Sequence, residues 1–492
     1  MHRTWARHPS ACGRVDRRTF LADCGMGLTG LVLGAMMQGE ARADDWRLPD
    51  GKPHFAPRAK RVIWLFMAGG VSHLDTFDPK PALNKYAGKT IAETPYKGAL
   101  DVSFVTKNVR NVASDTNIAI RNLLYPMQVG FRKLGQSGIE VTDWWPNLGE
   151  CVDDIAVIRS MWTSFNDHGA ILEMHTGRHI FDGFFPTVGA WVHYGLGSLN
   201  ENLPSFVVLG APPLDSTGGV QTYGADYLGT EHAGVRLDIE GDEPLPYASP
   251  GPDEFHEEQK SEFELIGKLN RASAVRYPSD PAVRARVKAY ELAFRMQVAV
   301  PEALQFKEES TEIGRLYGLD NKLTQPFGSA CLAARRLSER GVRFVQVFHG
   351  TGAGLDWDAH TNLKTNHADL CAKVDRPIAG LLRDLKQRGM LDDTLVVWST
   401  EFGRSPGSQG STGRDHHPYG FSVWMAGGGV RGGVVHGRTD ELGFHAVENR
   451  HYVTDIHATV MHQLGLDPQR LVVPGHRRLD IEIGNPIKEV LA

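Results

Sequence analysis

The sequence predicts an α/β protein with a doubly wound, mainly parallel sheet that carries helices on both faces. Two observations lead to this prediction. Apolar runs of strand length recur along the chain, and two helical stretches each end at a glycine that is followed by such a run. Repeated alternation of strands and helices is typical of a parallel sheet whose crossover connections are helical.

The central strands are predicted from continuous apolar runs. Val62 to Met67 is apolar at every position and leads to Gly69 and Gly70, as expected for a strand that is buried on both faces and ends in a tight turn. Comparable runs follow at residues 155–158, 206–209, 342–348, 395–398 and 421–425.

The helices between these runs are predicted from their spacing and their ends. A helical stretch over Phe327–Arg340 stops at Gly341, and a second one over about His367–Arg388 stops at Gly389. Glycine readily adopts the left-handed conformation that closes a helix, so each glycine marks a helix end.

Residues 211–325 interrupt the alternation. This region is rich in proline and glycine, carries acidic loops, and contains an amphipathic helix predicted over Pro281–Gln297, with Asp280 as its cap. We therefore predict one domain over residues 44–492 with a partly helical insertion at about 211–325.

The first residues have the three parts of an export signal. Arg17 and Arg18 are followed by an apolar run from Met26 to Met37, and Ala41 and Ala43 supply a small-x-small cleavage pattern. The run is shorter than the roughly 20 residues that span a bilayer. The sequence therefore predicts a twin-arginine signal peptide over residues 1–43, passage through the twin-arginine translocase, a periplasmic or extracellular location, and no stable membrane anchor.

Composition excludes some classes of partner. The formal net charge is -5 and charged residues make up 23% of the chain, so no basic excess would attract nucleic acid. Cys151, Cys331 and Cys371 follow the signal, none in a CxxC pair, so we expect buried apolar side chains and not a disulfide scaffold.

Histidines and acidic residues follow nearly every predicted strand. Ligands of open α/β sheets collect beyond the carboxyl ends of the strands, so these loops are the candidate site. Imidazole and carboxylate without thiolate suit zinc, manganese or iron(II). The alternative is a purely structural hydrogen-bond network. The loops that carry these residues are 72–75, 163–168, 349–360, 399–404 and 414–418.

Four strings of the sequence carry a family resemblance, and they are Leu65–Pro81, Trp357–His360, Glu401–Arg404 and Gly413–Pro418. They resemble the family known as domain of unknown function 1501, which is grouped with the alkaline phosphatase and sulfatase superfamily. The resemblance covers nearly all of the chain after the predicted signal. It implies an alkaline phosphatase-like fold, and family members commonly carry twin-arginine signals.

The resemblance also implies site residues, because superfamily members hold two adjacent metal ions beside a nucleophile. The positions that match suggest one or two divalent ions, zinc or manganese. Asp356 also stands four residues before His360, so the sequence leaves the choice of aspartate open. The metal ligands implied are His73 or Asp75, then Asp358 and His360, then Glu401, and then His416 or His417 with Asp415 beside them, and the nucleophile position falls on Thr163, Ser164 or His168.

The sequence departs from the superfamily at two points. Phe402 follows Glu401 where the superfamily has a histidine ligand, and no Cys-x-Pro-x-Arg string is present to form the formylglycine of true sulfatases. One metal in place of two is therefore an open alternative. His168 either replaces a missing ligand or stands at the nucleophile position.

Two functions remain open at this stage. The first is a metal-dependent hydrolase of a phosphate or sulfate ester, acting on an anionic small molecule or glycan, with Arg404 or Arg414 as the clamp for the anion. The second is a non-catalytic exported protein on the same fold that binds an anionic glycan or a protein partner.

The export signal gives a first testable prediction. Replacing Arg17 and Arg18 by lysines should leave unprocessed precursor in the cytoplasm, because the arginine pair is what marks the twin-arginine route. Cell fractionation with N-terminal sequencing measures this. Undiminished protein beginning at Asp44 outside the inner membrane would contradict the prediction.

Overall fold

The computed structural model describes residues 49–100, 121–239 and 299–492, apart from 352–354 and 477, with scattered residues between 241 and 296. Residues Pro49–Ala492 form one compact unit. The predicted signal at 1–43 lies outside the described residues, as does most of the predicted helix Pro281–Gln297.

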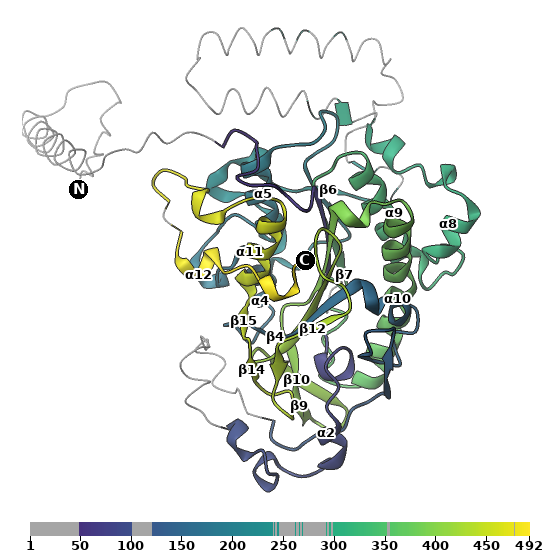
Figure 1. The fold of residues 1–492 in the computed structure, drawn as a ribbon, viewed down its shortest axis with the longest axis vertical. Coiled ribbons are helices and arrows are strands. Elements are labelled where there is room, and N and C mark those ends of the chain that lie inside the picture. Colours follow the sequence, from purple (N-terminus) through teal and green to yellow (C-terminus); the bar gives the residue numbers. More distant parts are fainter. Residues whose placement is uncertain are drawn as a thin grey trace, which may run out of the picture. The chain divides into compact units, whose positions relative to one another are not determined.

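The described part of the chain is built on a nine-stranded sheet with the order β12-β4-β11-β8-β1-β7-β5-β6, and β15 pairs with β4 beside β12 (Figure 1). The strands are β1 (Arg61–Met67), β4 (Ile155–Trp162), β5 (Phe206–Leu209), β6 (Val235–Leu237), β7 (Phe344–His349), β8 (Thr394–Ser399), β11 (Phe421–Ala426), β12 (Val434–His436) and β15 (His451–Tyr452).

Strand direction decides which loops meet. Strands β8, β1, β7, β5 and β6 run parallel, whereas β11 is antiparallel to both β8 and β4. Strand β4 therefore runs in the direction of β1, and the carboxyl ends of β1, β4, β7 and β8 lie at one edge of the sheet. Because β11 runs in the opposite direction, it begins at that same edge. The residues just before β11, which include β10 (Gly413–His417), therefore also lie at this edge.

Helices cover both faces of the sheet, as the sequence predicted. Alternate residues of β1 belong to two separate cores: Ile63 and Leu65 pack with helices α9 and α10, and Val62 and Trp64 pack with α4, α5 and α11. The helices are α2 (Pro81–Lys85), α4 (Ala170–Thr176), α5 (Val188–Leu196), α8 (Thr311–Leu316), α9 (Gln325–Glu339), α10 (Leu363–Gln387), α11 (Val453–Gln463) and α12 (Asp480–Ile483).

Three small antiparallel pairs complete the strands. The pair β9–β10 lies in the connection between β8 and β11, next to the edge where the carboxyl ends meet. The pairs are β2 (Phe131–Leu134) with β3 (Ile139–Thr142), β9 (Gly403–Gln409) with β10 (Gly413–His417), and β13 (Arg438–Thr439) with β14 (Ala446–Glu448).

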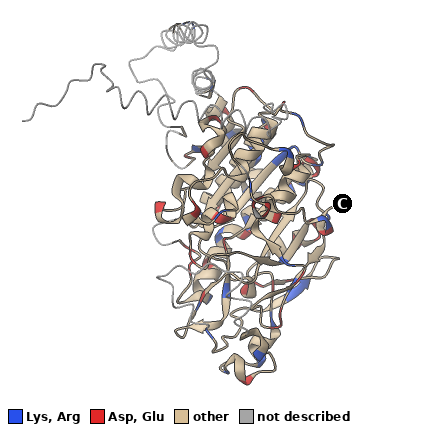
Figure 2. Ribbon diagram, turned by 90° about the vertical axis from the view of Figure 1, so that its left-hand side faces the viewer, with Lys and Arg blue, Asp and Glu red and all other residues tan. Residues whose placement is uncertain are grey.

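Acidic and basic residues are interspersed over the described elements (Figure 2). Some of them form a buried network between α9 and α10. Arg335 forms an ion pair with Asp384 at 2.9 Å and one with Glu309 at 2.6 Å, and Arg388 contacts the other oxygen of Asp384 at 2.7 Å. Breaking a buried pair leaves an uncompensated charge, so this network fixes how the two helices pack.

The predicted ends of the two long helices agree with those of α9 and α10 within a few residues. Gly341 and Gly389 have positive φ angles of 90° and 67°, as a left-handed helix end requires. Within the region 211–325, Val235–Leu237 joins the main sheet as its edge strand β6. Cys151, Cys331 and Cys371 are buried and unpaired. No described helix is long and apolar enough to cross a membrane.

The turn after β1 requires glycine. Gly69 and Gly70 have φ angles of 124° and 80°. A Cβ atom on Gly69 would lie 2.6 Å from the backbone nitrogen of Asp358, and one on Gly70 would lie 2.4 Å from the ring of Phe402. The absence of side chains therefore lets this turn pack directly beneath the loop that carries Asp358.

Candidate metal centre

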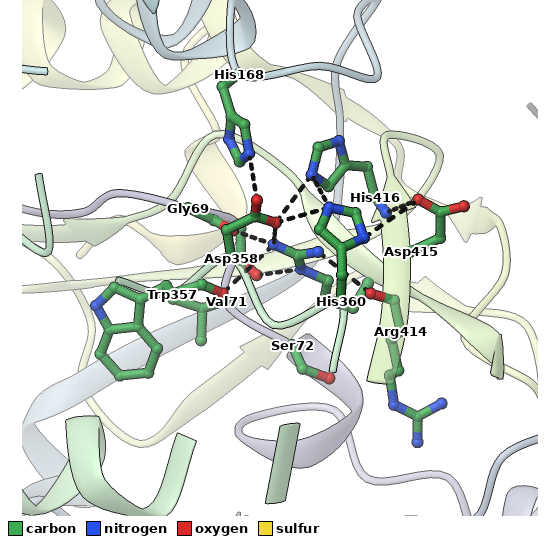
Figure 3. Close-up of polar contacts among 12 residues, drawn as sticks. Gly69, Val71, Ser72, His168, Trp357, Asp358, His360, Arg414, Asp415 and His416 are labelled. Carbon is green, nitrogen blue, oxygen red and sulfur yellow. Dashed lines mark hydrogen bonds and ion pairs between the residues drawn. The ribbon is translucent and has the colours of Figure 1, made fainter. Parts of the chain in front are cut away.

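Three potential metal ligands converge at the carboxyl edge of the sheet (Figure 3). Oδ1 of Asp358 lies 3.0 Å from Nε2 of His360 and 3.0 Å from Nε2 of His416, and the two Nε2 atoms are 3.0 Å apart. Asp358 and His360 lie in the connection from β7 to α10, and His416 lies on β10.

The other ring nitrogens show which tautomers are present. Nδ1 of His416 lies 2.9 Å from the backbone carbonyl oxygen of Asn166, and Nδ1 of His360 contacts the side-chain oxygen of Gln409. A carbonyl oxygen only accepts hydrogen bonds, so both Nδ1 atoms carry the hydrogen and both Nε2 atoms present lone pairs.

These lone pairs and the carboxylate oxygen repel one another unless a cation lies among them. Zinc binds imidazole nitrogen at about 2.0–2.1 Å, which places neighbouring ligands of a tetrahedral site about 3.3 Å apart. The observed separations of 3.0 Å are close to that value. The donor set therefore fits a divalent metal ion of the zinc type.

Asp358 and His416 are in the protonation states that bind metal, whereas the contact with Asp358 raises the pKa of His360, so an ion at His360 competes with a proton. Burial lowers the pKa of His416 to about 4, so its ring is neutral at pH 7. Burial would raise the pKa of Asp358, but its contacts with His168, His360 and His416, with the charge of Arg404, hold it far below its usual range. A neutral imidazole and an ionised carboxylate are the ligating forms.

His168 lies between two carboxylates. Its Nδ1 is 2.9 Å from Oε1 of Glu401, and its Nε2 is 3.2 Å from Oδ2 of Asp358. Burial alone would lower the pKa of His168, but the hydrogen bonds to Asp358 and Glu401 outweigh it and raise the pKa to about 9. The ring is therefore an imidazolium at neutral pH.

A second group of potential ligands adjoins the first. Asp167 and His168 can share an ion with His416, which belongs to both groups. Asp167 is exposed, and one of its oxygens accepts the backbone N–H of His168 at 2.7 Å. The second group thus places two further donors next to His416.

Arg404 is buried and contacts the candidate metal centre from the interior of the protein. Its guanidinium donates to the carboxylate of Asp358 at 2.7 Å and to the carbonyl oxygen of Gly70 at 2.7 Å. With its donors engaged in this way, Arg404 is placed to position Asp358 and not to clamp an anion. The other carbonyl oxygens that it contacts are those of Gly69, Trp357 and Arg414.

The side chain of Arg414 is likewise buried, and its donors are engaged within the protein. It pairs with Asp75 at 2.9 Å, and both side chains are fully buried. Asp75 also accepts from the hydroxyl of Ser72 at 2.7 Å and from the backbone of Gln128 at 2.8 Å. The carbonyl oxygens that the guanidinium contacts are those of Tyr125, Pro126, Ser405 and Pro406. Asp75 and Arg414 therefore form an internal ion pair outside the ligand groups.

His73 and His417 stack on each other with ring centroids 6.5 Å apart. Nε2 of His73 lies 2.9 Å from the carbonyl oxygen of Gly443, and Nε2 of His417 contacts that of Phe444. Burial lowers the pKa of His73 to about 4 and holds that of His417 well below its usual range. Both rings thus pack in the interior, outside the ligand groups.

The predicted nucleophiles lie elsewhere in the same loop. The hydroxyl of Ser164 donates to Glu173 at 2.6 Å, and the backbone N–H of the buried Thr163 donates to the carbonyl oxygen of Pro418 at 3.0 Å. The Thr163 hydroxyl is buried and makes no hydrogen bond to the described residues. Among the hydroxyl and imidazole candidates, only His168 contacts the ligands.

The structure therefore brings together Asp358, His360 and His416, with His168 beside them and Glu401 behind His168. Asp415 lies at the margin, where it pairs with Arg121 at 2.7 Å. The sequence reasoning did not select Asp167, Gln409 or Arg121. The adjacency of Asp167 to His168 was a usable signal, but nothing in the sequence marked Gln409 or Arg121.

Fold and site together define an α/β protein with a candidate metal centre at the carboxyl edge of a mainly parallel sheet. The chain belongs to the family described as "Protein of unknown function (DUF1501)", whose model matches residues 59–491. No curated protein matches the chain.

Solved structures similar to this chain include members of the superfamily that the sequence resemblance implied. One is a protein in the alkaline phosphatase superfamily from Vibrio parahaemolyticus, with 10% identity, 90% of this chain and 72% of that chain covered, and a TM-score of 0.38. The PsFucS1 sulfatase from Pseudoalteromonas sp. has 11% identity, 88% and 72% coverage, and a TM-score of 0.37. The C-terminal periplasmic domain of EcEptC from Escherichia coli, in complex with zinc, has 10% identity, 91% and 95% coverage, and a TM-score of 0.34.

The raised pKa of His168 predicts a pH dependence of stability in metal-free protein. The pKa is about 9 in the fold against 6.5 for the free side chain, so the stabilisation is complete below pH 6.5 and is lost as the pH rises toward 9. The slope between these values should approach roughly 1.4 kcal/mol per pH unit. Urea unfolding of wild type and His168→Gln from pH 6 to 10 measures it, and parallel curves for the two proteins would contradict the prediction.

Proposed function

We propose that this chain is an exported, metal-dependent hydrolase of a phosphate or sulfate ester, which works without a formylglycine. The observation that carries the proposal is the convergence of Oδ1 of Asp358 with Nε2 of His360 and Nε2 of His416, all 3.0 Å apart. Zinc is the ion that this set of one carboxylate and two imidazoles suits best, with manganese second.

We infer that the centre holds one ion. Two positive groups already contact Asp358: the guanidinium of Arg404 at 2.7 Å and the imidazolium of His168 at 3.2 Å. The ring of Phe402 packs 4.5 Å from that of His416 and offers no ligand. A second divalent ion at this carboxylate would meet both repulsion and an apolar surface.

A bound divalent ion would polarise the ester oxygen and lower the pKa of a bound water. The chain's own residues supply orientation and proton transfer. Glu401 fixes the ring of His168 through Nδ1, so Nε2 of His168 is the atom placed to give a proton to the leaving oxygen. Since the Ser164 hydroxyl donates to Glu173 and the buried Thr163 hydroxyl makes no hydrogen bond to the described residues, we propose water as the nucleophile.

The anionic part of the ester needs further positive charge, which Arg404 and Arg414 do not offer. Arg121 is the better candidate, because Asp415 holds its Nε at 2.7 Å beside His360 while a third of its side chain remains exposed. A third of the His360 side chain is also exposed, and its Nδ1 lies 3.8 Å from the same Asp415. An anionic small molecule or glycan ester would therefore approach from the side of His360 and Arg121.

Export through the twin-arginine translocase completes the proposal. This route carries folded proteins, so the ion could be acquired in the cytoplasm before the chain reaches the periplasm or the exterior. The support is the pair Arg17 and Arg18 with the apolar run and cleavage pattern that follow.

A second candidate function is a non-catalytic exported binding protein on the same fold. The burial of Arg404 and Arg414 and the engagement of the Ser164 hydroxyl by Glu173 favour it. Such a protein would bind an anionic glycan or a protein partner and would show no turnover with metal bound.

Metal content tests the centre itself. His360→Ala should lose about one equivalent of zinc or manganese per chain relative to wild type, because removing one of three protein ligands abolishes most of the affinity. The fold should persist, since the apolar strands do not depend on His360. Elemental analysis with His462→Ala, a partly exposed histidine of α11, as the control measures this, and equal metal content in all three proteins would contradict the assignment.

Turnover separates the two candidate functions. Metal-loaded protein should hydrolyse an aryl phosphate or aryl sulfate, and chelation should abolish this activity reversibly. Glu401→Gln should lower kcat by about 10- to 100-fold, because Glu401 orients His168. Absence of turnover on phosphate monoesters, diesters and sulfates by metal-loaded protein, together with tight binding of an exported polysaccharide, would favour the binding protein.

A further inference from the structure

A second pair of histidines lies at the edge of the sheet, away from the candidate metal centre. His436 ends β12 and His451 begins β15, and both strands pair with β4, opposite Ile158 and Met161. Their Nε2 atoms are 2.9 Å apart. Because a shared neighbour holds both strands, the two rings are fixed relative to each other by the backbone of the sheet.

A carboxylate orients one ring of the pair. Nδ1 of His451 lies 2.8 Å from Oδ2 of Asp455, and the other oxygen of Asp455 accepts the backbone N–H of Asn485 at 2.8 Å. Nδ1 of His451 therefore donates its hydrogen, and its Nε2 points a lone pair at His436. A carboxylate behind an imidazole is the arrangement that orients histidine ligands toward metal ions.

We propose that His436 and His451 form a second metal site, for an ion that prefers imidazole nitrogen, such as Zn²⁺, Ni²⁺ or Cu²⁺. Two nitrogens bound at about 2.0–2.1 Å in a tetrahedral site lie about 3.3 Å apart, so the rings need to separate by only about 0.4 Å. The side chains of His451 and Asp455 keep 14% and 13% of their surface exposed, which leaves the remaining positions to water.

The site is independent of the proposed hydrolysis. It shares no residue with the centre at Asp358, His360 and His416. An ion on His436 and His451 would join β12 and β15 along β4, so its role would be to stabilise this edge of the sheet.

The competing explanation is a plain hydrogen bond in which Nε2–H of His436 donates to Nε2 of His451. It accounts for the same 2.9 Å separation. The two explanations differ in metal uptake, because a hydrogen bond binds no ion. Metal uptake also separates this site from the candidate metal centre when the centre is disabled by His360→Ala.

The test is calorimetric titration with Zn²⁺ of chelator-stripped protein that comprises residues 44–492. His360→Ala should bind one equivalent, and His360→Ala with His436→Ala should bind one equivalent less. Asp455→Asn in the same background should weaken binding about 10- to 100-fold. His360→Ala with His462→Ala is the matched control, because His462 lies on the helix of Asp455 but in neither site.

Folding is checked by circular dichroism, and His451→Gln serves as a second variant if His436→Ala does not fold. Zinc should also raise the melting temperature of His360→Ala but not of the double variants that lack His436 or His451. Equal zinc uptake with and without His436 and His451 would overturn the second site and leave the centre at Asp358 untouched.

Discussion

The contact on which the centre depends is the one between the buried guanidinium of Arg404 and the carboxylate of Asp358, at 2.7 Å. The same guanidinium contacts the carbonyl oxygens of Gly69 and Gly70 in the turn after β1. Arg404, which lies on β9, therefore links its hairpin to the connection after β1 and to the connection after β7. Losing it would leave a buried carboxylate without its fixed partner and would release the loop that carries the ligands.

The charges around this contact support the proposal that the ligand is an anionic ester. Without metal, the carboxylates of Asp358 and Glu401 are balanced by Arg404 and by the imidazolium of His168, whose pKa is raised to about 9. His416 stays neutral because burial lowers its pKa to about 4. A divalent ion would add two positive charges to a balanced group, and an anionic ester is the ligand that would restore the balance.

Sequence reasoning predicted the sheet and part of the centre. Continuous apolar runs identified the strands, because a strand buried on both faces has no polar alternation. It could not choose between His416 and His417, which point to opposite faces of β10 and so reach Asp358 and Phe444 respectively. Nor could it predict that Asp75 pairs with Arg414. That pairing depends on the reversed direction of β11, which places the preceding hairpin, and Arg414 with it, at the carboxyl edge of the sheet.

The most direct test of the account is anomalous X-ray scattering from crystals of protein purified from its native compartment, recorded at the zinc and manganese absorption edges. The account predicts one strong peak among Oδ1 of Asp358, Nε2 of His360 and Nε2 of His416. A map with no peak at this position in protein that contains metal, or with a peak at His73 and His417 in its place, would contradict it.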